Sequence, residues 1–189
     1  MHINDIEQLE RDKYTRIHAA MDYSSKSIIG FLDYCQRVIP KKMTILEIGS
    51  GTGLFMREMI RAGYTVTGSD ITLTGMAKDM RDLSHEFPIW KIPFPDNAFD
   101  WVVSCDVMEH IPTDLIPGAC REMERVARWG QVHNIATFQG TKFLGYDCHL
   151  TVKPIEWWYR RFDFRTNDIH LIERPGGGEF KHMERYVQK

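Results

Sequence analysis

The sequence is poor in cysteine and lacks a long apolar run. Its 189 residues include four cysteines, at positions 35, 105, 120 and 148, and no two of them have the spacing of a metal-binding pair. No stretch approaches the roughly 20 apolar residues of a membrane-spanning helix. The polar segment from Met1 to Lys13 also lacks the apolar core of a signal peptide. We therefore expect free thiols, no metal ligands, no membrane association and a cytoplasmic location.

The sequence also lacks an excess of charge of either sign. It has 24 lysines and arginines against 26 aspartates and glutamates, which leaves a formal net charge of −2. Broad nucleic-acid binding requires a basic excess, so the composition gives no strong signal for it. The apolar share of 43% is ordinary for a globular protein, and the length suits one domain with a hydrophobic core.

Short apolar runs alternate with helical patterns along most of the chain. We predict strands over 43–48, 64–69, 89–92, 99–105 and 131–138, and helices over 3–21, 23–38, 54–62, 73–83, 114–128 and 154–162. Two more strands, 167–173 and 180–187, flank a glycine-rich turn and should pair antiparallel. The expected fold is an α/β, Rossmann-like three-layer sandwich. Its seven-stranded, mostly parallel sheet would carry an antiparallel C-terminal strand.

The most informative segment is a glycine-rich loop directly after the first predicted strand. Three glycines stand there at alternate positions, which are Gly49, Gly51 and Gly53. Glycine permits a positive φ and lets a ligand approach the backbone, at the end of the strand where open α/β sheets bind ligands. A dinucleotide fingerprint would need a glycine where Leu54 stands. Glu47, two residues ahead of the loop, would repel a pyrophosphate but suits an ammonium group.

Asp70, at the end of the second predicted strand, is the second acidic signal. In such folds an acid at this point accepts hydrogen bonds from ribose hydroxyls. The alternative is that Asp70 only caps a helix or turn. Together with Glu47, it indicates a ligand with a ribose and an ammonium group but no pyrophosphate.

With these motifs the chain resembles the class I S-adenosylmethionine-dependent methyltransferases, of the small methyltransferase type 11 kind. The likeness spans roughly residues 43–138, and it consists of five motifs in order, which are 47–53, Asp70, 92–100, 102–111 and 121–130. It implies S-adenosylmethionine as cofactor and S-adenosylhomocysteine as product. It also implies a set of cofactor-binding residues, which are Glu47, Gly49, Ser50, Gly51, Gly53, Asp70, Ile71, Ile89 and Asp106. The family's adenine-binding acid has no counterpart at Pro88, so Ile71 and the backbone near Ile89 should hold the base.

Three residues are candidates for the chemistry, namely His110, Asp106 and His149. Methyl transfer from a sulfonium is a direct displacement that depends largely on alignment, and a base is needed only if the acceptor must lose a proton. His110 suits such a base because an unperturbed imidazole titrates near neutrality. The alternative, which the sequence favours slightly, is that His110 caps or packs the following loop. Asp106 should lie near the methionyl end of the cofactor. His149 lies after the fifth predicted strand, in a loop that often faces the acceptor.

We expect one S-adenosylmethionine-binding domain over 1–189. It divides into an N-terminal helical lid over 1–40, a cofactor-binding core over 41–140 and an acceptor-side segment over 141–189. The lid would bring Tyr14 or Tyr23 near the cofactor.

The predicted function is methyl transfer to a small-molecule or glycan-type acceptor, and a homodimer is one expected assembly. Two alternatives stay open: a catalytically inactive cofactor-binding partner or regulator, and a nicotinamide oxidoreductase, against which Leu54 argues. The aromatic run from Trp157 to Tyr159 would either pack in the core or wall the acceptor pocket.

Overall fold

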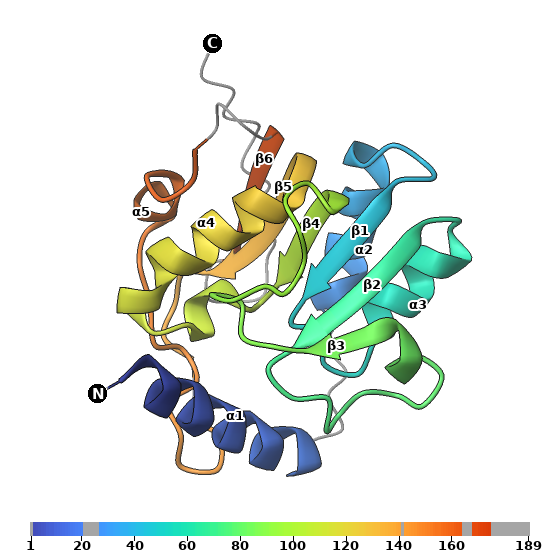
Figure 1. The fold of residues 1–189 in the computed structure, drawn as a ribbon. Coiled ribbons are helices and arrows are strands. Elements are labelled where there is room, and N and C mark those ends of the chain that lie inside the picture. Colours follow the sequence, from blue (N-terminus) through green and yellow to red (C-terminus); the bar gives the residue numbers. More distant parts are fainter. Residues whose placement is uncertain (1, 21–26, 141, 164–167, 175–189) are drawn as a thin grey trace.

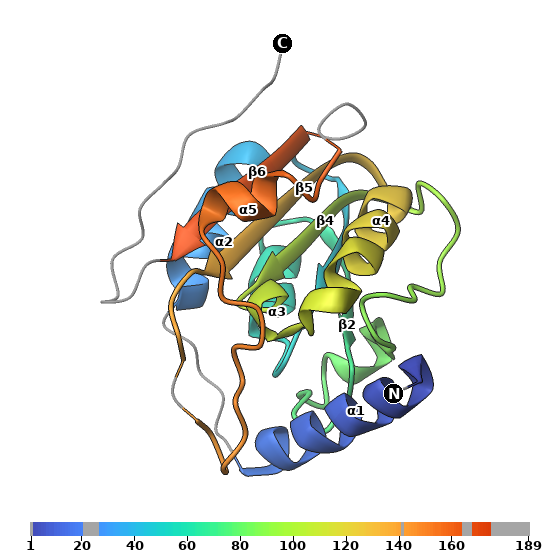
Figure 2. The same ribbon diagram turned by 90° about the vertical axis from the view of Figure 1, so that its left-hand side faces the viewer.

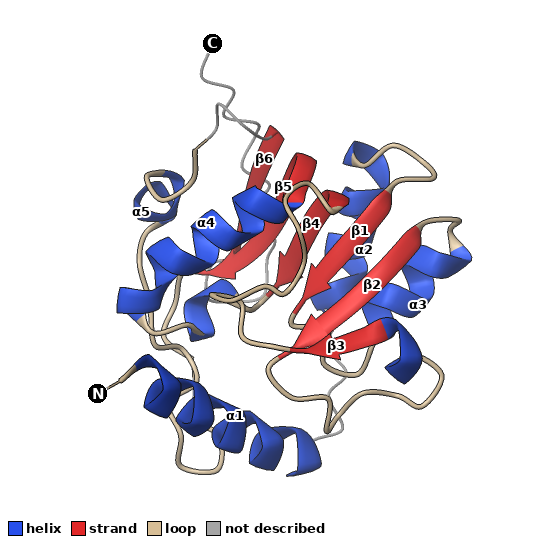
Figure 3. Ribbon diagram, viewed as in Figure 1, coloured by secondary structure: helices blue, strands red, loops and turns tan. Residues whose placement is uncertain are grey.

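A six-stranded parallel sheet forms the middle layer of the molecule (Figures 1 and 3). The computed structural model describes residues 2–20, 27–140, 142–163 and 168–174. Within them the strand order is β3-β2-β1-β4-β5-β6, and every pair of neighbours is parallel. The strands are β1 (Thr44–Ile48), β2 (Thr65–Asp70), β3 (Ser84–Glu86), β4 (Phe99–Cys105), β5 (Ala127–Ala136) and β6 (Asp168–Arg174).

Helices cover both faces of the sheet and one end of its strands. They are α1 (Ile3–Ala20), α2 (Ser27–Val38), α3 (Leu54–Arg61), α4 (Ile116–Val126) and α5 (Ile155–Tyr159). Side chains of α2 and α3 belong to one buried apolar cluster and those of α4 and α5 to another, so the sheet lies between two layers of helix. The predicted α/β three-layer fold is therefore confirmed. No helix in the described part of the chain is long and apolar enough to cross a membrane.

Helix α1 does not join either layer. It lies across the end of the sheet toward which the strand arrowheads point (Figures 1 and 2). The strand order also reverses at β1, which pairs with β2 on one side and with β4 on the other. The connections that leave β1 and β4 therefore diverge, and this opens a crevice at the carboxyl end of the sheet beneath α1.

Two predicted elements are wrong. The third strand is Ser84–Glu86 rather than 89–92. The apolar side chains of Ile89, Trp90 and Ile92 are buried in the core from an irregular segment, where Lys91 N–H donates to the carbonyl of Pro88. A short apolar run in the sequence does not distinguish a buried strand from a buried segment that pairs with no strand.

The predicted helix over 73–83 is a series of turns that ends in a 3₁₀ helix at Arg81–Leu83. The hydroxyl of Thr72 accepts the backbone N–H of Thr74 at 3.4 Å. Local bonds of this kind compete with helix formation, and this favours turns over a regular helix in the segment.

At the other end, β6 pairs with β5 in parallel register, from Gly130 with Asp168 to Ala136 with Arg174. The predicted seventh strand, 180–187, and its antiparallel pairing lie outside the described residues.

Candidate functional site

A cavity of about 470 Å³ lies in the crevice between the carboxyl ends of the strands and α1. Its walls come from the loops after β1, β2, β4 and β5 and from one face of α1. Of the residues that the sequence assigns to the cofactor, all line this cavity except Gly53. The two candidate catalytic histidines, His110 and His149, line it as well.

The three glycines of the loop after β1 all have positive φ, between 52° and 79°. They meet different surroundings. A Cβ on Gly49 would lie 2.3 Å from the side chain of Val107, and one on Gly53 would lie 2.8 Å from Met76. A Cβ on Gly51 would meet nothing within 4 Å, because Gly51 borders the open cavity. Gly49 and Gly53 thus allow close packing, whereas Gly51 leaves room for a ligand against the backbone.

Asp70 connects the end of β2 to this loop. Its two carboxylate oxygens accept hydrogen bonds from the backbone N–H groups of Gly51, at 2.9 Å, and Ile71, at 2.8 Å. Only 9% of the residue is exposed, and burial raises the pKa of its carboxyl group. Each oxygen has a second lone pair, so the carboxylate can hold the loop and still accept a bond from a ligand.

Glu47, the next-to-last residue of β1, is only 5% exposed. Its Oε2 is buried without a hydrogen-bond partner among the described residues. Burial, with a smaller contribution from the charge of Asp70, raises the pKa of Glu47 to about 8. A positively charged ligand group would both supply the missing partner and favour the ionised carboxylate.

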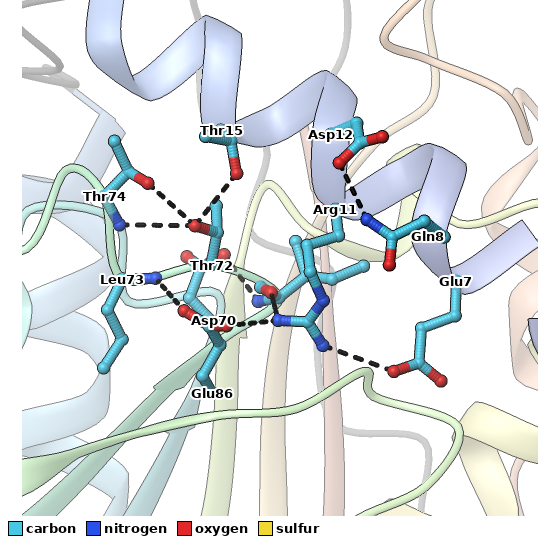
Figure 4. Close-up of polar contacts among 11 residues, drawn as sticks. Glu7, Gln8, Arg11, Asp12, Thr15, Asp70, Thr72, Leu73, Thr74 and Glu86 are labelled. Carbon is cyan, nitrogen blue, oxygen red and sulfur yellow. Dashed lines mark hydrogen bonds and ion pairs between the residues drawn. The ribbon is translucent and has the colours of Figure 1, made fainter.

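Helix α1 is attached to the far side of the cavity by side chains from its middle turns (Figure 4). The guanidinium of Arg11 donates to the carbonyl of Ile71 and to Glu86, both at 2.5 Å. Thr15 donates to the hydroxyl of Thr72 at 3.2 Å. Helix α1 thereby places Tyr14, Ile17 and His18 along the cavity. Tyr23 lies outside the described residues.

Asp106 has a strained backbone, with φ of 55°, directly after β4. Its carboxylate accepts a hydrogen bond from Asn134 at 3.1 Å and forms an ion pair with Arg174 at 3.0 Å. Arg174 ends β6 and also lines the cavity. Aspartate tolerates this φ better than a β-branched or bulky residue would.

The histidines approach one another at the same end of the cavity. Nδ1 of His110 is 2.7 Å from the hydroxyl of Tyr14, and the two histidine rings lie 4.9 Å apart. Nδ1 of His149 donates to the carbonyl of Phe138 at 2.7 Å. Burial, and then the neighbouring charge of His149, lowers the pKa of His110 to about 3. His110 is therefore neutral at pH 7 and a weaker base than the sequence suggests.

The sequence analysis missed several residues of the cavity wall, which are His18, Trp90, Phe138 and Arg174. They come from α1, from irregular segments and from the end of β6, where no sequence motif marks them. Arg174 had one usable signal, because it directly follows the predicted strand 167–173. None of Trp157, Trp158 and Tyr159 lines the cavity, and Trp158 is fully buried in the core. Of the two predicted roles for these aromatic residues, core packing is the one observed.

Comparison with known proteins agrees with this geometry. Residues 46–133 match the family model described as a methyltransferase domain. The chain is 30% identical to the ubiquinone biosynthesis O-methyltransferase of Actinobacillus pleuropneumoniae over 137 residues, which cover 60% of this chain and 58% of that protein. It is also 30% identical to a sterol 24-C-methyltransferase of Gibberella zeae over 104 residues, 49% of this chain and 27% of the relative. The chain thus spans less than two thirds of the curated relatives that it matches.

Solved structures show the same fold. The 1,6-didemethyltoxoflavin-N1-methyltransferase of Burkholderia thailandensis superimposes with a TM-score of 0.59 at 11% identity, covering 69% of this chain and 62% of its own. The [4+2]-cyclase SpnF superimposes with a TM-score of 0.55 at 19% identity, covering 70% and 55%. At such low identity these similarities concern the arrangement of strands and helices alone.

Proposed function

Because residues 46–133 form a class I S-adenosylmethionine-dependent methyltransferase domain, we propose that this chain transfers the methyl group of that cofactor to a small-molecule or glycan-type acceptor. One observation carries the proposal. Glu47, Gly51 and Asp70 line the same cavity as His110 and His149. The ubiquinone biosynthesis O-methyltransferases among the relatives also support a small acceptor.

The cofactor end of the cavity fits the groups of S-adenosylmethionine. Glu47, whose buried Oε2 has no partner among the described residues, would receive the ammonium group. Asp70 would accept hydrogen bonds from the ribose hydroxyls, and the cofactor would pass closest to the backbone at Gly51. Ile71 and Ile89 would enclose the adenine by apolar contact, since the wall near Pro88 offers no acid.

The acceptor end would align the second substrate. When bound, S-adenosylmethionine supplies a methyl group already activated by the positive charge on sulfur. The task left to the chain is mainly to hold the acceptor in line with that group. Neutral His110 can exchange a hydrogen bond with the acceptor, and the Asp106–Arg174 pair supplies charge beside it.

Binding and turnover test the proposal separately. Calorimetric titration should show binding of S-adenosylhomocysteine and none of NAD. Incubation with labelled S-adenosylmethionine and a panel of hydroxyl- and amine-bearing small molecules should then yield S-adenosylhomocysteine and a labelled product. Tight NAD binding would contradict the cofactor, whereas cofactor binding with no turnover on any acceptor would favour the inactive partner.

We predict that Asp70→Ala weakens binding of S-adenosylhomocysteine without unfolding the chain. Loss of charge-assisted hydrogen bonds to the ribose should raise the Kd by one to two decades, about 1.5–3 kcal/mol. Calorimetry measures the Kd, and circular dichroism checks the fold. Asp79→Ala is the control, because Asp79 is an exposed aspartate paired with Arg57 away from the cavity. An unchanged Kd in the Asp70 variant would leave Asp70 as a turn residue only.

The pKa of Glu47 leads to a second prediction. If ionised Glu47 binds the ammonium group, affinity for S-adenosylhomocysteine should rise between about pH 6.5 and about pH 8.5, by at most tenfold per pH unit. At higher pH the affinity should level off. The charge that acts on Glu47 is that of Asp70 of β2. Cys35 of α2 and Cys105 of β4 also lie near Glu47, but burial raises the pKa of both thiols, so they stay uncharged over this pH range. Glu47→Gln should bind more weakly and with a flatter pH profile. Identical profiles in the parent and this variant would refute the assignment.

A further inference from the structure

We propose that Glu109, His110 and His149 form a binding site for a divalent transition-metal ion at the acceptor end of the cavity. Each side chain offers one ligand atom, and these three atoms lie within 4.8 Å of one another. Glu109 and His110 follow β4, whereas His149 lies on the loop after β5, so only the fold brings them together. The earlier expectation of no metal ligands was drawn from the cysteines and did not consider this cluster.

The carboxylate of Glu109 is the strongest sign of a missing cation. Glu109 is 0% exposed. Its Oε1 accepts the backbone N–H of Ala136 at 3.1 Å, but its Oε2 is buried with no hydrogen-bond partner in the described part of the chain. Buried charged groups in proteins are generally paired or bound to metal ions, because an isolated one is costly. Nε2 of His110 lies 4.0 Å from Oε1, which is too far for a hydrogen bond.

Both histidines have the outer hydrogen bonds typical of metal ligands. In such sites the ring nitrogen that does not bind the metal is held by a carbonyl, carboxylate or similar group, and this fixes the ring. Nδ1 of His149 donates to the carbonyl of Phe138, which leaves the lone pair of Nε2 free for a metal. Nδ1 of His110 pairs with the hydroxyl of Tyr14, which leaves Nε2 on the side of Glu109.

The ligand set selects the class of ion. Two imidazole nitrogens and one carboxylate oxygen suit Zn²⁺, Mn²⁺, Fe²⁺ or Co²⁺, whereas Ca²⁺ and Mg²⁺ prefer sites made of oxygen. Metal–ligand bonds are about 2.1 Å long, so the side chains would close by about an ångström when an ion binds. Three protein ligands leave coordination positions open, as in catalytic rather than structural sites.

The position of the cluster suggests what the open positions would hold. His110 and His149 line the part of the cavity that we assign to the acceptor. An ion there would take an oxygen atom of the acceptor as a further ligand and fix its orientation. This role rests on the proposed function and points to acceptors that carry hydroxyl groups. The metal site itself does not depend on it, because its ligands are all side chains of this chain.

Metal binding can be measured without the cofactor. The full chain is stripped of metal with a chelator and titrated with Co²⁺, whose visible absorption reports its ligands, and with Zn²⁺ in a calorimeter. We expect one ion per chain, and a Kd at least about tenfold weaker in both His149→Ala and Glu109→Gln. His85→Ala should bind like the parent, because His85 is an exposed residue of β3 that does not belong to the cluster. Tyr14→Phe, which removes the outer partner of His110, should weaken binding by about ten- to 100-fold.

The outcomes are distinct. Failure to bind one equivalent of either ion overturns the site, as does equal binding by the parent and His149→Ala. Glu109→Gln changes a buried carboxylate and could unfold the chain. His149 lies on a loop, so the metal affinity of His149→Ala tests the site even if the Glu109 variant does not fold. Titration with S-adenosylhomocysteine tests the proposed function separately, and its failure would leave the metal result standing.

Discussion

Replacing Gly51 with valine should remove measurable binding of S-adenosylhomocysteine while the chain stays folded. Gly51 has φ of 52°, a conformation that β-branched residues rarely adopt, and its missing Cβ faces open space in the cavity. The valine side chain would occupy the space where the cofactor must approach the backbone. We expect the Kd to rise by roughly 100-fold or more, about 2.7 kcal/mol. A thermal shift assay with and without the ligand measures this, because a ligand that does not bind cannot stabilise.

The same substitution at Gly63 provides a matched control. Gly63 has φ of 91° and also has nothing within 4 Å of an added Cβ, but it lies in the turn between α3 and β2, away from the cavity. Both variants should lose about 1–3 kcal/mol to backbone strain, which lowers the melting temperature by several degrees. Gly63→Val should keep the ligand-induced shift, whereas Gly51→Val should lose it. Equal shifts in the two variants would place the binding site elsewhere.

Replacing Trp158 with alanine should produce the largest loss of stability in the core. Trp158 is 0% exposed and packs in the apolar cluster that joins α4 and α5 to the sheet. Truncation of a buried tryptophan leaves a cavity and costs about 3–5 kcal/mol, which for a chain of this length lowers the melting temperature by roughly 10 °C. Calorimetric or circular dichroism melting curves measure the change.

Two further substitutions, Trp158→Phe and Trp157→Ala, separate the effect of packing from that of a lost hydrogen bond. Nε1 of Trp158 is buried with no hydrogen-bond partner among the described residues. Trp158→Phe therefore loses no hydrogen bond and should cost much less than Trp158→Ala. Trp157→Ala, on the same helix, should also cost less, because Trp157 is only partly buried and stacks under the guanidinium of Arg161. A similar loss in all three variants would contradict the prediction that the buried side chain of Trp158 is the main contribution of α5 to the core.

The position of β1 in the sheet determines where the candidate site lies. Because β1 is central and the order of strands reverses there, its loop ends in the crevice rather than beneath a neighbouring connection. Glu47 and Asp70 then face one cavity from adjacent parallel strands, with Glu47 in register with Gly68, two residues before Asp70. Helix α1 closes the far side through Arg11 and Thr15.

The sequence by itself determined the features that depend on local physics. Three glycines at alternate positions after an apolar run favour a turn with positive φ, and Gly49, Gly51 and Gly53 all adopt it. Asp70 was predictable for the same reason, because the end of a strand is visible in the sequence and parallel strands end at one edge. The alternation of strands and helices likewise follows from periodicity, which each segment carries in its own residues.

Only the tertiary structure decided the features that depend on distant segments. The segment 89–92 has the composition of a strand, but it packs as an irregular stretch because Ser84–Glu86 pairs with β2 instead. The cluster of Glu109, His110 and His149 combines residues about 40 positions apart, and the Asp106–Arg174 pair combines residues still farther apart. Burial of Glu47 and His110 shifts their pKa values in opposite directions from ordinary ones. Such proximity and burial arise only when the sheet, the loops and α1 enclose the cavity, and periodicity within a segment carries no record of them.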